Sequence, residues 1–329
     1  MYKNFFKLKR NPFEITPDPS FLFPTRKHNE ALAALYYGVR RHKGFVVLTG
    51  EVGTGKTLLV RCLLQLLNRK DVAYAYVFNS RLDPVEFLQY IIGDFGLNAA
   101  GKNKSELLLE LSGFLISRHR QKQTTVLVVD EAHHLAVDVL EEVRLLTNLE
   151  TSEEKLLQIL LVGQPELDEK LDSNELRQLK QRIALRSQLL PLTLEETEGY
   201  IQRRLQLSAA ANSPATGLFP AETMARVFRH TSGIPRLINT VCENALITAF
   251  ARQSPEVTPD VIDEVAMDFR LNISQPPKPG LAAEPEGNEM WQAVKTLLEL
   301  HDHLQTVRMQ DPDRDDDGTI EISPRSHPI

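Results

Sequence analysis

The sequence contains little of what marks a disulfide scaffold, a membrane protein or a secreted protein. It has two cysteines in 329 residues, Cys62 and Cys242, and both lie in apolar segments with a helical pattern. We expect two buried thiols, not a disulfide or a metal pair. No apolar run approaches the ~20 residues that cross a bilayer. Residues 1–7 lack the apolar core and the cleavage site of a signal peptide. These absences predict a cytoplasmic protein.

The chain also lacks a general excess of basic residues. Its formal net charge is −6, from 38 Lys and Arg against 44 Asp and Glu. Residues 272–329 hold five of the basic and eleven of the acidic residues, so residues 1–271 are neutral, with 33 of each. This balance excludes the uniformly basic surface of many nucleic-acid-binding proteins. Only two local clusters, 40–43 and 118–120, remain as candidates for contacts with a phosphate backbone.

Short apolar runs alternate with helical patterns over the first part of the chain. The runs are typical of buried parallel strands, and they cover Phe45–Thr49, Val72–Phe78, Val126–Val129, Leu157–Val162 and, more weakly, Ser187–Leu192. Helical patterns precede or separate them at His28–Arg41, Thr57–Asn68, Pro84–Phe95, Ser105–Arg120 and Val137–Leu149. The alternation predicts an α/β domain over 26–192, a three-layer sandwich whose parallel sheet is covered by helices on both faces.

Only helical patterns follow residue 192. They cover Glu195–Ala210, Pro220–His230, Pro235–Arg252 and Pro259–Phe269, and three of them open with a proline suited to a first turn. We therefore expect a small all-helical domain over 193–271. Residues 1–25, rich in proline and aromatic residues, are expected to form an extended lead-in held by aromatic burial. A Pro-rich linker (272–289), an amphipathic helix (290–308) and an acidic disordered tail (309–329) complete the prediction.

The segment after the first apolar run has the pattern of a phosphate-binding loop. Its residues are Gly50-Glu51-Val52-Gly53-Thr54-Gly55-Lys56-Thr57, which satisfies G-x-x-x-x-G-K-[ST] between a strand and a helix. Glycines let the backbone N–H groups cradle a β-phosphate. Lys56 would reach the β- and γ-phosphates, and the Thr57 hydroxyl would ligate Mg²⁺. The expected nucleotide contacts are these eight residues and the next one, Leu58.

A pair of carboxylates ends a later apolar run. Asp130 and Glu131 follow Val126–Val129, so they lie at the end of a buried strand where parallel sheets bind their ligands. Asp130 would hold Mg²⁺ through water, and Glu131 would polarise an attacking water. Asp130-Glu131-Ala132-His133 spells a helicase box, but no companion helicase motif occurs. We interpret His133 and His134 as residues that begin a helix, not as metal ligands.

A phosphate loop in an α/β domain followed by a helical lid resembles the AAA+ family of ATPases. Four stretches resemble its ExeA/GspA branch, whose members serve type II secretion and pilus or exopolysaccharide export and are related to the transposition ATPases MuB and TniB. These stretches are Asn11-Pro12-Phe13, Thr16-Pro17-Asp18-Pro19, Leu48–Thr57 and Gly233-Ile234-Pro235-Arg236-Leu237-Ile238-Asn239. The resemblance covers residues 1–271. Secretion-type members often continue into a transmembrane helix and a peptidoglycan-binding domain, and this sequence contains neither.

The resemblance implies roles for three further polar residues. Asn79 matches a switch that holds the catalytic glutamate inactive until a partner arrives, and its alternative is an ordinary turn residue. Gln164 matches sensor 1, which contacts the γ-phosphate or the attacking water, although Asn, Ser or Thr is commoner there. Arg236 matches sensor 2, whose guanidinium would contact the γ-phosphate and close the lid.

The resemblance also implies an arginine finger, which a neighbouring subunit inserts to offset charge in the transition state. Arg182 matches its position best, with Arg186 second and Arg177 as a further candidate. The alternative is that the three arginines form a solvated basic helix face.

These expectations describe a Mg²⁺-dependent ATPase that works as a homo-oligomer with ATP and Mg²⁺ as cofactors. Its expected partners are protein components of an export or envelope-assembly apparatus, through which it would reach the inner membrane. Two alternatives stay open. One is a DNA-targeting ATPase of the transposition kind, and the other is a switch or scaffold that binds ATP without hydrolysing it.

Overall fold

Five parallel strands form the centre of the residues that the structure, a computed structural model, describes: 2–67, 71–78, 81–210 and 217–271. The strands are β1 (Phe45–Gly50), β2 (Val72–Val77), β3 (Thr124–Val129), β4 (Gln158–Gly163) and β5 (Leu185–Leu189), in the order β2-β3-β4-β1-β5. Each agrees with a predicted apolar run to within three residues at either end. The predictions for Asn79, 272–289, 290–308 and 309–329 lie outside the described residues.

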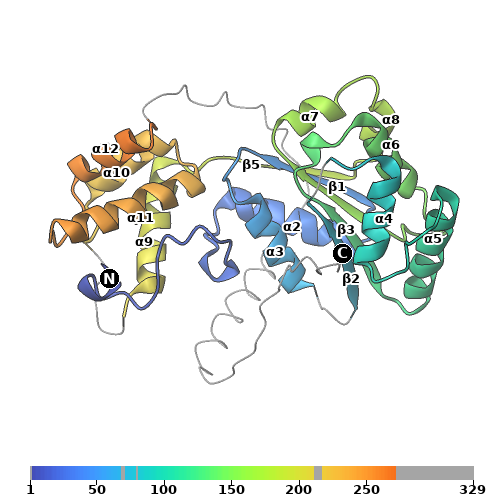
Figure 1. Cartoon of the computed structure of the whole chain (residues 1–329), viewed down its shortest axis with the longest axis horizontal. Helices are drawn as coiled ribbons and strands as arrows, with labels where there is room; N and C mark the ends of the chain where they lie inside the picture. Colours follow the sequence, from blue (N-terminus) through green and yellow to red (C-terminus); the bar gives the residue numbers. More distant parts are fainter. Residues whose placement is uncertain (1, 68–70, 79–80, 211–216, 272–329) are drawn as a thin grey trace. The chain divides into compact units, whose positions relative to one another are not determined.

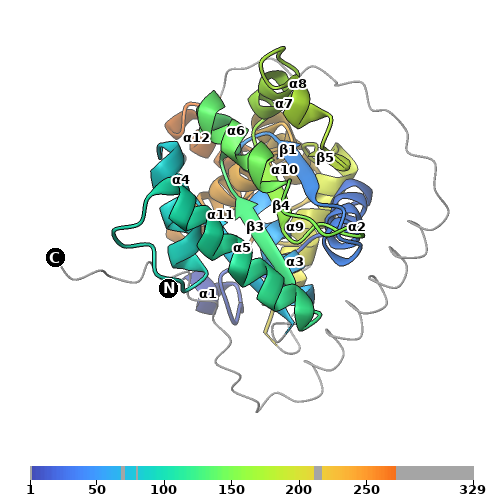
Figure 2. The same cartoon turned by 90° about the vertical axis from the view of Figure 1, so that its right-hand side faces the viewer.

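Helices cover both faces of this sheet, as the alternation in the sequence predicts (Figures 1 and 2). Phe45 and Val47 of β1 pack on one side with α4 (Pro84–Asp94), α5 (Lys104–Arg120), α6 (Val137–Leu146) and the short α7 (Glu166–Leu171) and α8 (Arg177–Lys180). Val46 and Leu48 pack on the other side with α2 (Arg26–Arg40) and α3 (Lys56–Leu66). Every residue of β1, β3 and β4 is buried, which is why these strands read as unbroken apolar runs.

Side-chain caps fix where several helices begin. The Thr25 hydroxyl accepts from the His28 N–H at the start of α2, and Asp83 and Asn103 form capping boxes at α4 and α5. Each such cap stabilises its helix by about 1 kcal/mol. Because these helices start at fixed residues, the loops that precede them have fixed ends as well.

In the described residues after β5, four helices form a separate core. They are α9 (Leu194–Ser208), α10 (Ala221–Thr231), α11 (Pro235–Ala251) and α12 (Pro259–Asp268), and their apolar faces meet around Ile201, Val241 and Leu246. No helix that the structure describes is both long enough and apolar enough to cross a membrane.

The lead-in packs into this helical core and also touches the α/β part. Phe13 is fully buried in the helical core, the Arg204 guanidinium donates to the Pro12 carbonyl at 2.8 Å, and Leu8 pairs with Ala209 in an isolated bridge. Further along, the Arg61 guanidinium of α3 donates to the Pro17 carbonyl at 2.9 Å. Aromatic burial is confirmed, but the lead-in is not extended throughout. It contains a helical turn, α1 (Tyr2–Phe5), and a 3₁₀ turn, η1 (Pro19–Phe21).

The two cysteines are free and buried, as the sequence predicts. Burial raises the pKa of the Cys62 thiol to about 12 and raises that of Cys242 as well. Both side chains therefore act as small apolar core residues.

A backbone hydrogen bond at Gly233 joins the start of α11 to the residues that follow β5. Gly233 has φ +74° just before α11, and its carbonyl accepts from the Leu192 N–H at 2.8 Å. A Cβ atom at Gly233 would lie 1.9 Å from the Leu192 carbonyl oxygen. Only glycine permits both this backbone conformation and this close approach.

Gly233→Ala should therefore destabilise the protein far more than a substitution at a glycine that has a positive φ but no atom close to its Cβ position. Gly96→Ala is the matched control, because Gly96 also has a positive φ (+81°) but nothing within 4 Å of its Cβ position. We expect the control to lower the free energy of unfolding by about 1 kcal/mol and Gly233→Ala to lower it by more. Urea denaturation measures both, and equal losses would contradict this packing.

Candidate functional site

The phosphate loop connects the end of β1 to the first turn of α3. Gly53 and Gly55 have φ values of +83° and +101°, so both adopt the left-handed conformation that glycine permits. The Thr54 hydroxyl donates to the Glu51 carbonyl at 2.8 Å, and the buried His28 ring contacts the Thr54 carbonyl at 3.2 Å. These contacts hold the loop in a tight turn at a helix N-terminus, the arrangement that binds phosphate groups.

Lys56 lies inside the loop and is 6% exposed. Its Nζ donates to the carbonyls of Gly50 at 2.7 Å and Glu51 at 3.0 Å. Burial lowers the pKa of the Lys56 ammonium, and the carboxylates of Glu131 and Asp130 counteract that shift. The loop therefore holds a positive charge against its own backbone, at the place where a phosphate would be bound.

Asp130 brings the two predicted motifs together. It directly follows β3, is 7% exposed, and its Oδ2 accepts from the Thr57 hydroxyl at 3.1 Å and from the Tyr76 hydroxyl at 2.7 Å. Its Oδ1 accepts from the Glu131 backbone N–H at 2.9 Å. Tyr76 is a partner of Asp130 that sequence reasoning missed. Its position on β2 gave no signal, because an aromatic residue in a strand usually indicates packing alone.

The oxygen ligands at this point suit Mg²⁺ better than a softer metal. Thr57 offers a hydroxyl and Asp130 a carboxylate, and Mg²⁺ prefers one or two such protein ligands together with water and phosphate oxygens. No cluster of three His, Cys, Asp or Glu side chains able to hold a metal occurs in the part of the chain that the structure describes. A metal here would therefore depend on the nucleotide for further ligands.

Glu131 and Gln164 lie on either side of His133. Glu131 has a left-handed backbone (φ +51°), and its Oε2 lies 3.5 Å from Nδ1 of His133. Gln164 directly follows β4, and its Nε2 lies 2.9 Å from Nε2 of His133. His133 and His134 fall in a 3₁₀ turn, η2 (Ala132–His134), so the predicted helical start is a single turn.

Arg236 brings the helical part to the phosphate loop. It belongs to the first turn of α11, and its backbone N–H donates to the Gly53 carbonyl at 3.2 Å. A Cβ atom on Gly53 would lie 2.7 Å from the Cβ atom of Arg236. The structure thus places this predicted sensor against the loop.

The three candidate fingers lie around α8 and β5, and they differ in their contacts. Arg186 lies 3.5 Å from carboxylate oxygens of both Asp168 and Asp172. Arg182 donates to the Thr147 hydroxyl at 3.2 Å and forms no ion pair among the described residues, although together with Lys155 it lowers the pKa of the nearby Glu150 carboxyl. Arg177, at the start of α8, shares a polar surface hollow with Arg182. Arg182 is therefore freer than Arg186 to contact another chain.

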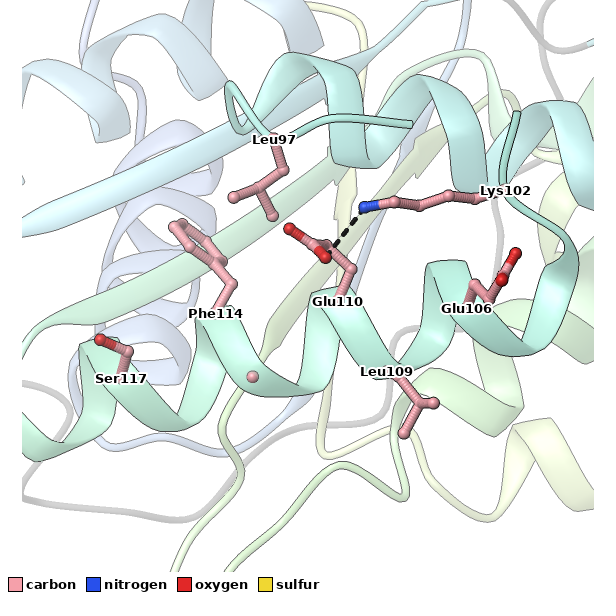
Figure 3. Close-up of a pocket in the computed structure, with 8 residues that line it drawn as sticks. Leu97, Lys102, Glu106, Leu109, Glu110, Phe114 and Ser117 are labelled. Carbon is pink, nitrogen blue, oxygen red and sulfur yellow. Dashed lines mark hydrogen bonds and ion pairs between the residues drawn. The ribbon is translucent and has the colours of Figure 1, made fainter. Parts of the chain in front are cut away.

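A second hollow lies on the outer side of α5 and contains none of the predicted site residues (Figure 3). Lys102 pairs there with Glu110 at 2.9 Å, beside the apolar side chains of Leu97, Leu109 and Phe114. Its glycine, Gly113, lies within α5, so this hollow has no glycine loop at a helix N-terminus that could bind phosphate.

Comparisons with known proteins agree with this geometry. A family model described as AAA domain matches residues 39–171. The chain is 44% identical over 258 residues to general secretion pathway protein A of Aeromonas hydrophila, in an alignment that covers 78% of this chain and 46% of that protein. The chain thus spans about half the length of this relative.

Solved structures share the fold at much lower identity. The ORC2 protein of Aeropyrum pernix superposes with a TM-score of 0.60 at 17% identity, covering 79% of this chain and 72% of that chain. Cdc6p of Pyrobaculum aerophilum superposes with a TM-score of 0.58 at 18% identity, covering 83% and 72%. The phosphate loop, the strand order and the identity to the Aeromonas protein together show that this chain belongs to the AAA+ family of nucleotide-binding proteins, in the branch of general secretion pathway protein A.

Proposed function

We propose that this chain binds Mg²⁺ and ATP on the 50–57 loop and hydrolyses the ATP with Glu131. The observation that carries the proposal is the 3.1 Å hydrogen bond from Thr57 to Asp130, which joins two motifs 73 positions apart in one site. A helix N-terminus, a buried ammonium and a carboxylate pair then face the same point of the sheet edge.

The loop would bind the phosphates through its backbone and through Lys56. On binding, the Lys56 ammonium can exchange the Gly50 and Glu51 carbonyls for phosphate oxygens while remaining buried. A buried cation is screened less by water, so its attraction to the developing charge on the γ-phosphate is stronger. Arg236 would approach the same phosphate from the lid, as its position on Gly53 supports.

Thr57 and Asp130 would hold the metal, which supplies positive charge to the phosphates when bound. Tyr76 keeps Asp130 in place by donating to the oxygen that also accepts from Thr57. Burial and the neighbouring Asp130 carboxylate raise the pKa of the Tyr76 phenol, so it remains a donor at neutral pH.

Glu131 is the residue we assign to polarise the attacking water. Its side chain is 47% exposed, so water can reach it, and its backbone N–H is fixed on Asp130. The Gln164 amide would complete the water site from the neighbouring strand, and Asn79 is the proposed switch on Glu131.

Hydrolysis would be completed by a second copy of the chain that inserts Arg182. Arg186 forms ion pairs with Asp168 and Asp172, whereas Arg182 forms none among the described residues, and this difference supports Arg182 over Arg186. Export or envelope assembly is the proposed process, because the identity to general secretion pathway protein A is 44% over most of the chain.

Tyr76→Phe should weaken the metal site without changing the fold, since the ring stays in its packed position. We expect the Mg²⁺ concentration that half-saturates binding of a fluorescent ATP analogue to rise roughly tenfold, as for other residues that orient metal ligands. Tyr74→Phe on the same strand is the matched control, because Tyr74 is 36% exposed. An unchanged Mg²⁺ requirement in Tyr76→Phe would contradict this role.

ATP turnover per chain, measured against protein concentration, tests the proposed function. We expect turnover to rise with concentration in the wild type and to fall by about a thousandfold in Arg182→Ala, the usual size of a finger's contribution. Arg177→Ala is the control from the same surface. Glu131→Gln should bind ATP and not hydrolyse it.

Two outcomes of this experiment would contradict the proposal. Turnover that is independent of protein concentration, and equal in Arg182→Ala and the wild type, would contradict a site completed by a second copy of the chain. Tight ATP binding with no turnover at any concentration would favour the non-hydrolysing switch. A separate DNA-binding assay tests the other alternative, because ATP-dependent binding that weakens as salt rises would favour a DNA-targeting ATPase.

A further inference from the structure

His28, in the first turn of α2, contacts the phosphate loop from a separate element. Its Nε2 lies 3.2 Å from the Thr54 carbonyl oxygen, and its Nδ1 lies 2.7 Å from the hydroxyl of Thr25, the residue that caps α2. Both His28 and Thr25 are buried. A Cβ atom on Gly55 would lie 3.5 Å from Nε2 of His28. The ring therefore lies beside the peptide unit that joins Thr54 to Gly55.

The partners of the His28 ring determine which nitrogen carries its proton. A carbonyl oxygen only accepts hydrogen bonds, so Nε2 must donate to Thr54. Burial lowers the pKa of His28, against the opposing effects of the Thr54 carbonyl and the Glu196 carboxylate, so the ring is neutral at neutral pH. In a neutral ring Nδ1 then accepts from the Thr25 hydroxyl, whose oxygen accepts in turn from the His28 backbone N–H at 3.2 Å. Each polar atom thus has a partner of the right kind.

This ring is the one partner that the described residues give the Thr54 carbonyl. The Thr54 N–H and hydroxyl donate to the Glu51 carbonyl at 3.3 and 2.8 Å, but neither contact fixes the direction of the Thr54 carbonyl. The next residue, Gly55, has φ +101°, and glycine adopts either sign of φ without a steric penalty. Without the His28 hydrogen bond, the peptide unit between Thr54 and Gly55 could therefore turn over.

The direction of this peptide unit decides what a phosphate would meet. In a trans peptide the C=O and N–H groups point in opposite directions. Because the Thr54 carbonyl faces His28, the Gly55 N–H faces away from the ring, and no described residue accepts from it. Loops of this kind bind phosphate through such unpaired N–H groups. The reversed unit would present a carbonyl oxygen, which repels a phosphate.

We infer that His28 is a positioning residue for the nucleotide, and that its Nε2–H holds the Thr54 carbonyl so that the Gly55 N–H stays available to a phosphate. The inference rests on the proposed function. It adds a residue outside the 50–57 loop that keeps the empty loop in its binding conformation. Apparent affinity is proportional to the fraction of molecules already in that conformation. Loss of this hydrogen bond should therefore weaken nucleotide binding.

Nucleotide binding by two matched variants of His28 tests this role. Gln can place an amide N–H where Nε2 of His28 donates, whereas Asn is one methylene shorter and reaches only to the place of Nδ1. We expect His28→Asn to raise the Kd for Mg²⁺ and a non-hydrolysable ATP analogue about tenfold, and His28→Gln to raise it less than about threefold. Both variants remove the ring, so an effect of packing alone would appear in both.

His230→Asn is the control for the loss of a histidine elsewhere in the chain. His230 belongs to α10, and its Nε2 lies 2.7 Å from the Asp263 carboxylate. This substitution should leave the Kd for the ATP analogue unchanged. Urea denaturation of the three variants shows whether each one is folded.

Nuclear magnetic resonance of the protein without nucleotide tests the hydrogen bond itself. Nitrogen-15 spectra of the nine histidines report which ring nitrogen carries the proton, with His28 assigned from its loss in His28→Gln. We expect the Nε2–H form in the wild type. The Gly55 amide should give one sharp signal in the wild type and in His28→Gln, and a split or broadened signal in His28→Asn. The wild-type ring spectrum decides the position of the proton even where His28→Asn does not fold.

The outcomes separate this inference from the proposed function. If the wild type binds the analogue but shows no ATP turnover, hydrolysis fails, and the affinities of the variants still decide the role of His28. If the wild type binds the analogue while His28→Asn and His28→Gln bind it equally well, or if the proton is on Nδ1, the role of His28 is wrong and the proposed function stands. If the wild type binds no nucleotide, both are wrong.

Discussion

The site depends on a backbone that turns tightly enough to leave its N–H groups facing a phosphate. Gly53 and Gly55 allow that turn, because a side chain on either would force an L-residue into a left-handed conformation. At Gly53 there is a second requirement, since the lid residue Arg236 occupies the space that a Cβ atom would need. The same absence of a side chain thus shapes the loop and lets the lid contact it.

The other features of the site follow from the position of this loop. It follows β1, and β4 separates β1 from β3, so Asp130 reaches Thr57 across the end of the intervening strand. Gln164 comes from the end of that intervening strand, which brings it beside Glu131 through His133. The strand order alone therefore decides that the loop, the carboxylate pair and the sensor meet at one edge of the sheet.

The lead-in adds a connection between the helical part and the nucleotide domain. Arg204 of α9 binds the Pro12 carbonyl, and Arg61 of α3 binds the Pro17 carbonyl only five residues later. The lead-in therefore ties the helical part to α3, the helix that begins with Lys56.

The sequence predicted the parts of this structure that depend on local pattern. Buried strands produce apolar runs, and the phosphate loop needs glycines at fixed spacing, so β1, the 50–57 loop and Asp130 could be read directly. The short helices α7 and α8 were not predicted, because one or two turns carry too little periodicity. Tyr76 was missed as a site residue for another reason. Its role comes from a hydrogen bond to Asp130 on the neighbouring strand, and a tyrosine that only packs gives the same local pattern.

We propose that the nucleotide binds between the glycine loop and the lid residue that packs on it. Calorimetric titration of Mg²⁺ and ATP into the wild type, Gly53→Ala and Gly101→Ala is the most direct test of this binding site. Gly101 has a similar positive φ (+72°) but nothing within 4 Å of its Cβ position. We expect one nucleotide per chain in the wild type and in Gly101→Ala, and binding at least about a hundredfold weaker in Gly53→Ala. No binding by the wild type, or equal affinity in all three proteins, would contradict it.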